Sequence, residues 1–76
     1  MPWSTVRVQH HDGTPARGAR VVLGFEGLGA GMTSSVLTDR YGEAQVEHAT
    51  TGRATVYVNG QGRTSFHAPG TVNVTL

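Results

Sequence analysis

Apolar and polar residues alternate along most of this chain, and this period-two pattern predicts β-strands that bury one face. Near the start, Val6 and Val8 alternate with Arg7 and Gln9. No window sustains the i, i+3, i+4 spacing of an amphipathic helix, because glycine and proline interrupt the chain too often. The pattern predicts about seven strands. They lie at 3–10, 19–25, 32–38, 43–48, 53–58, 64–67 and 71–76.

Turn-forming residues separate the predicted strands. A glycine-rich loop fills 26–31, and the other predicted turns are Asp12-Gly13-Thr14-Pro15, Asp39-Arg40-Tyr41-Gly42, Thr50-Thr51-Gly52, Asn59-Gly60 and Pro69-Gly70. Asn-Gly in particular favours a two-residue hairpin. Short strands with a turn every ~8–12 residues predict a single all-β domain over 1–76, an antiparallel sandwich or barrel.

The parity of each strand also predicts which side chains form the core. Positions that share the apolar parity must be buried together, because each strand has to cover that face. The predicted core residues are Val21, Leu23, Val46, Val56, Val58 and Val74.

Composition narrows the function classes. The 76 residues carry a net charge of +1, and the basic residues are arginines spread along the chain rather than clustered. Scattered arginines argue against a nucleic-acid partner, since such proteins show a basic patch. The absence of cysteine excludes disulfides, thiolate catalysis and cysteine-bound zinc. The N-terminal segment lacks the pattern of a signal peptide, and no apolar run predicts a membrane span, so location stays open.

Three blocks of sequence resemble the carboxypeptidase regulatory-like (transthyretin-like) domain family. They are GTPARGARVVL at 13–23, TDRYGEA at 38–44 and TGRATVYV at 51–58, and they follow one another in the family's order. The resemblance implies a seven-stranded antiparallel Greek-key β-sandwich of the prealbumin-like type. It also implies an accessory module, with no catalysis of its own, that supports folding, spacing or protein contact.

Two functional relatives within this resemblance can be compared with the residues. Surface-adhesin relatives form an internal isopeptide bond from a lysine, and this chain has no lysine. The transthyretin-related hydroxyisourate hydrolases end in a Tyr-Arg-Gly-Ser motif, whereas this chain ends in Asn73-Val74-Thr75-Leu76. A hydrolase of that type is therefore an alternative that would need a His–Arg cluster at a subunit interface.

Candidate chemistry elsewhere in the chain is sparse. Neutral imidazole is a good metal ligand, but His10, His11, His48 and His67 follow no metal-binding spacing. No serine lies in a Gly-x-Ser-x-Gly elbow, and no carboxylates form a close pair. We therefore predict no catalytic residue, no cofactor and no metal site.

The sequence instead favours a structural or protein-interaction module. Outward parity of aromatic and apolar residues, together with the uncharged last strand, predicts a contact surface. Its candidate residues are Trp3, Val22, Tyr57, Val72, Asn73 and Val74. We expect self-association or a protein partner. A carbohydrate-binding sandwich is a second alternative, if Trp3, Tyr41 and Tyr57 share one exposed platform.

Overall fold

The computed structural model of the chain describes residues 2–26 and 31–76, and all of its regular structure is β. The strands are β1 (Trp3–Gln9), β2 (Arg20–Phe25), β3 (Val36–Leu37), β4 (Glu43–Glu47), β5 (Gly52–Val58), β6 (Gln61–Ala68) and β7 (Thr71–Thr75). The described residues contain no helix, as the period-two pattern predicted. Five of the strands match their predicted ranges to within one residue at each end.

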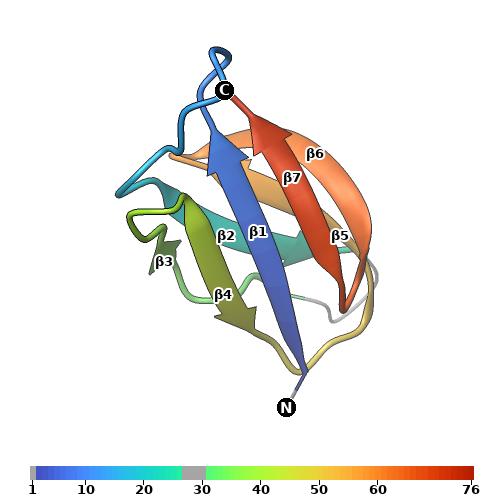
Figure 1. The fold of residues 1–76 in the computed structure, drawn as a ribbon. Helices are drawn as coiled ribbons and strands as arrows, with labels where there is room; N and C mark the ends of the chain where they lie inside the picture. Colours follow the sequence, from blue (N-terminus) through green and yellow to red (C-terminus); the bar gives the residue numbers. More distant parts are fainter. Residues whose placement is uncertain (1, 27–30) are drawn as a thin grey trace.

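The strands form two layers that face each other (Figure 1). One is a three-stranded sheet with the order β4-β1-β7, and the other is a four-stranded sheet with the order β3-β2-β5-β6. Hairpins join β2 to β3 and β5 to β6 within the four-stranded sheet, while the remaining connections cross between the sheets. The all-β, sandwich-like prediction is therefore confirmed.

The core between the layers is built mainly from small branched side chains. All six predicted core residues are buried. The full buried set is Val6, Val8, Ala16, Ala19, Val21, Leu23, Ala44, Val46, Ala54, Val56, Val58, Ala68 and Val74. Its members occupy alternate positions of their strands, so the parity read from the sequence was correct.

One strand pair contradicts the purely antiparallel arrangement. β1 and β7 run parallel, from Thr5 beside Thr71 to Gln9 beside Thr75. The 69–70 turn explains this direction. The amide of Thr5 donates to the carbonyl of Gly70 at 2.9 Å, which fixes the start of β7 beside the start of β1. The two strands must then run the same way.

Two strand lengths also differ from the prediction. β6 is longer than 64–67, because Asn59 and Gly60 both adopt positive φ and form a tight hairpin that brings Gln61 directly into pairing. A register shift opposite Val56 and Tyr57 accommodates the extra residue. β3 is shorter than 32–38, because the amide of Leu23 donates to the side-chain oxygen of Thr33 and not to a backbone carbonyl.

Candidate interaction surface

The structure brings together two of the predicted contact residues on the outer face of the four-stranded sheet. Val22 on β2 and Tyr57 on β5 are direct cross-strand partners. Both point away from the core and are partly exposed. They form the centre of what we call the tyrosine face, which comprises Val22, Tyr57 and Met32.

Two glycines flank the ring of Tyr57, and Gly24 makes room for it. A Cβ at Gly24 on β2 would lie 2.8 Å from Cε2 of Tyr57, and one at Gly62 on β6 would lie 3.5 Å from Cε1. The ring therefore lies across the sheet, from the strand on one side of β5 to the strand on the other. Met32, which forms an isolated bridge with Gly24, lies beside it and is largely exposed. An aromatic ring fixed in this way offers a rigid contact area at low entropic cost.

The other predicted contact residues belong to the three-stranded sheet. Trp3 is 56% exposed at the start of β1, and Asn73 is exposed on β7. Val72 faces inward and packs against the core. Val74 is only 3% exposed, so its inclusion as a surface side chain was wrong. Inward parity already placed Val74 in the core, and only the backbone of β7 lies at the sheet edge.

The two edges of the three-stranded sheet differ in charge. β7 has the sequence TVNVT, with no charged side chain and no proline. β4, at the opposite edge, has the sequence EAQVE and presents Glu43 and Glu47 on its outer side. Charged side chains protect an edge from pairing with another chain. β7 is therefore the unprotected edge of this sheet.

A buried Ser–His pair links β1 to the end of β4. Ser4 Oγ lies 2.7 Å from Nε2 of His48, and Nδ1 of His48 lies 2.7 Å from the carbonyl oxygen of Thr50. Because a carbonyl can only accept, Nδ1 donates to Thr50, and with one hydrogen on the ring Nε2 is the acceptor for the Ser4 hydroxyl. The amide of Gly70 in turn donates to Ser4 Oγ.

This pair lies inside the fold and links two of its strands. Ser4 and His48 are buried, and both ring nitrogens of His48 are already hydrogen-bonded within the fold. A cavity of about 300 Å³ touches the ring beside Phe25, but the ring offers it no free nitrogen. The sequence contained one signal of the pair, since Ser4 and His48 have the inward parity of their strands.

Of the remaining histidines, His10 and His11 are sequence neighbours, whereas His67 lies on β6. His10 and His11 are exposed at the turn after β1, and the carboxylate of Asp12 beside them accepts from the amide and hydroxyl of Thr14. These hydrogen bonds, the backbone one foremost, lower the pKa of Asp12. No group of three or more metal-ligating side chains occurs among residues 2–26 and 31–76.

His67 is the one histidine that pairs with an arginine across strands. It lies opposite Arg53 on the outer face of β5 and β6, and Arg53 donates to Ser65 Oγ at 3.2 Å. Arg53 and His67 are both exposed. The His–Arg cluster that the hydrolase alternative requires would therefore have to be built on this pair, which lies on an open sheet face.

The three aromatic side chains of the carbohydrate alternative are not brought together. Trp3 is opposite Glu47 at the start of β1, whereas Tyr41 lies in the turn before Glu43, which is opposite Arg7 farther along β1. Tyr57 lies on the other sheet. The shared platform that this alternative requires is absent for these residues.

Comparison with known proteins assigns this chain to no family. Neither a scan against protein-family models nor a search of curated proteins finds a match to this chain. Within the described ranges, no helix could cross a lipid bilayer.

Proposed function

We propose that the chain is a non-catalytic protein-interaction module with a transthyretin-like, Greek-key topology, and that it self-associates through β7. The strand orders β4-β1-β7 and β3-β2-β5-β6, joined by repeated crossings between sheets, support the Greek-key assignment. The burial of Ser4, which is 1% exposed, supports a role without catalysis, because a substrate could not reach its hydroxyl.

The sequence blocks behind the family resemblance have structural roles, which supports the same assignment. In the first and second blocks, the hydroxyl of Thr38 donates to the carbonyl of Ala16 and accepts from the amide of Ala19. Gly42 adopts a φ of +77°, and a side chain there would collide with the carbonyl oxygen of Val8. These residues hold the turns against β1, as expected of a scaffold motif.

The open, uncharged edge of β7 is the observation that carries the proposed self-association. β7 is paired with β1 on one side only, so its other side presents unpaired backbone groups. Two copies of β7 related by a two-fold axis through their middle residues would place Asn73 opposite Asn73 of the second copy. The pairing would extend the sheet and cover the partly buried Val72.

Sedimentation equilibrium tests this proposal. The purified chain should show a dimer at ~100 μM, where weak interfaces populate measurably. Asn73→Lys should abolish the dimer while circular dichroism stays unchanged, since it places two like charges opposite each other. Gln45→Lys is the matched control, because it adds the same charge to the outer side of β4. A strict monomer, or a dimer that tolerates Asn73→Lys, would contradict pairing through β7.

A further inference from the structure

The acidic side chains of this protein are almost all engaged. Asp12 accepts from Thr14, and Asp39 Oδ1 accepts from the amides of Tyr41 and Glu43. Two arginines have carboxylate partners, since Arg7 pairs with Glu43 at 2.8 Å and Arg53 lies 3.7 Å from Glu26. Within the described part of the chain, four arginines form no ion pair. They are Arg17, Arg20, Arg40 and Arg63.

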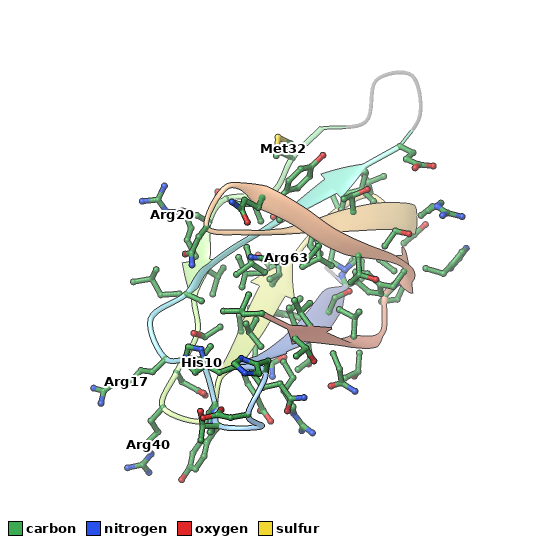
Figure 2. The ribbon with its side chains drawn as sticks, turned by 90° about the horizontal axis from the view of Figure 1, so that it is seen from above. His10, Arg17, Arg20, Met32, Arg40 and Arg63 are labelled. Atoms are coloured by element: carbon green, nitrogen blue, oxygen red, sulfur yellow. The ribbon has the colours of Figure 1, made fainter. Side chains whose placement is uncertain are left out.

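The fold collects three of these four arginines along one border of the molecule. Arg20 is directly opposite Leu37 in the pairing of β2 with β3. The amide of Gly18 donates to the carbonyl of Thr38, which joins two segments of the chain. Arg17 and Arg40 lie on these two segments, just beyond the hydrogen bond. Figure 2 shows Arg17, Arg20 and Arg40 along the same side. Arg63 belongs to β6, the edge strand opposite β3 in the four-stranded sheet. The even spread of arginines in the sequence concealed this gathering.

Two exposed apolar side chains accompany these arginines. Leu37 is 64% exposed and Tyr41 is 60% exposed, and the guanidinium of Arg40 lies 5.0 Å from the centre of the Tyr41 ring. We call this set the arginine edge, comprising Arg17, Arg20, Leu37, Arg40 and Tyr41. Asp39 is the acidic residue beside it, and its Oδ1 is occupied by backbone amides. With three guanidinium groups against this one carboxylate, the arginine edge keeps an excess of positive charge around an apolar centre.

The backbone of the arginine edge is also open to pairing. β3 is the last strand of the four-stranded sheet. Both the amide and the carbonyl of Thr38 bond toward the β2 side, to Ala19 and Gly18. Backbone groups of successive residues in an extended chain point to opposite sides, so those of Leu37 point toward the open border. An extended segment could add here by strand pairing.

We propose that the arginine edge binds an extended segment of a different protein that carries both carboxylates and apolar side chains. Charge complementarity selects such a partner, because guanidinium groups bind carboxylates through paired hydrogen bonds. A second copy of this chain fits poorly, since its own arginine edge would repel and four of its five side-chain carboxylates are engaged elsewhere. The site lies on the opposite sheet from β7 and is independent of the proposed self-association.

A labelled twelve-residue peptide of alternating Glu and Val is the probe, and fluorescence anisotropy is the measurement. We expect saturable binding that weakens with salt. Arg40→Glu should weaken it about tenfold, which corresponds to roughly 1.4 kcal/mol. Arg63→Glu makes the same charge change away from the arginine edge and should alter affinity less than about twofold. Leu37→Ser should weaken binding with little change in its salt dependence, because it removes apolar contact and no charge.

Four outcomes would overturn the proposal. They are no saturable binding by the wild-type chain, equal binding of a Lys–Val peptide, an equal loss in Arg63→Glu, and tighter binding of a single-stranded DNA dodecamer that ignores Leu37→Ser. The last outcome would indicate a nucleic-acid partner. Circular dichroism of each variant checks that it folds. Asn73→Lys should leave peptide binding unchanged, so failure of the β7 dimer and failure of the arginine edge are separate results.

Discussion

The outer faces of the two sheets follow the same alternation of side chains but have opposite chemistry. On the three-stranded sheet, outward residues pair with one another across strands. Thr5 bonds to Gln45, Arg7 to Glu43, and Gln9 to Thr75. On the four-stranded sheet, the tyrosine face presents an aromatic ring, a valine and a methionine, and the arginine edge lies at its β3 border.

This difference separates a face whose polar groups are satisfied from one that still has contacts to make. A polar group that already has a partner within the chain gains little from a new one. Apolar area gains from being covered, and an unpaired guanidinium group gains from a carboxylate partner. The three-stranded sheet therefore offers a partner its β7 edge and the exposed Trp3 at the start of β1. The four-stranded sheet offers its face and its β3 border. The following predictions test this contrast.

The largest effect should come from the side of the four-stranded sheet that faces the core. Val56→Ala should lower the free energy of unfolding by roughly 1–3 kcal/mol, because Val56 is fully buried and its truncation leaves a cavity. Val22→Ala, on the tyrosine face, should cost less than about 1 kcal/mol. Denaturant titration measures both. An equal cost at the two positions would mean that the tyrosine face is packed like a core.

A smaller loss of stability should come from truncating Ser4, the buried serine on β1 of the three-stranded sheet. Ser4→Ala should destabilise the domain by about 1–2 kcal/mol, because it leaves Nε2 of His48 buried without a donor. The exposed Ser35 gives the control, and Ser35→Ala should stay within about 0.5 kcal/mol. In a His48→Phe background, Ser4→Ala should cost clearly less than it does alone. Equal costs in both backgrounds would argue against the hydrogen bond as the source.

The smallest effect on stability should come from the paired polar side chains on the outer face of the three-stranded sheet. A double-mutant cycle on Arg7→Ala and Glu43→Ala should give a coupling of about 0.2–1 kcal/mol, since this ion pair is partly exposed. The coupling should shrink as salt is added. A coupling well above this range that did not change with salt would show that these polar pairs contribute more to stability than solvent-exposed ion pairs do.

Alternation along the chain was enough to predict most of the fold. It located the strands, their inward residues, and the Asn59-Gly60 hairpin, because each depends on local sequence. It could not show that β7 would run parallel to β1, since that direction depends on the long-range bond between Thr5 and Gly70. The shortened β3 depends on a Thr33 side chain that replaces a backbone acceptor.

The candidate sites were predicted less completely for the same reason. Outward parity correctly made Val22 and Tyr57 candidates, but only the register shows that they are opposite each other. The arginine edge joins residues that are up to 24 positions apart, from Arg17 to Tyr41, and no local pattern links them. Likewise, Ser4 and His48 have the inward parity of their strands, but nothing in the sequence shows that they bond to each other.

The parallel pairing of β1 and β7 has a mechanical consequence. Trp3, at the start of β1, and Thr75, at the end of β7, lie at opposite ends of this strand pair (Figure 1). Tension applied through the two flanking chain segments would therefore pull along the strands. The slanted hydrogen bonds between the five paired residues of each strand would be loaded in shear and would have to fail together. Resistance to pulling is governed by the unfolding rate, so this module can bear load beyond what its small core suggests.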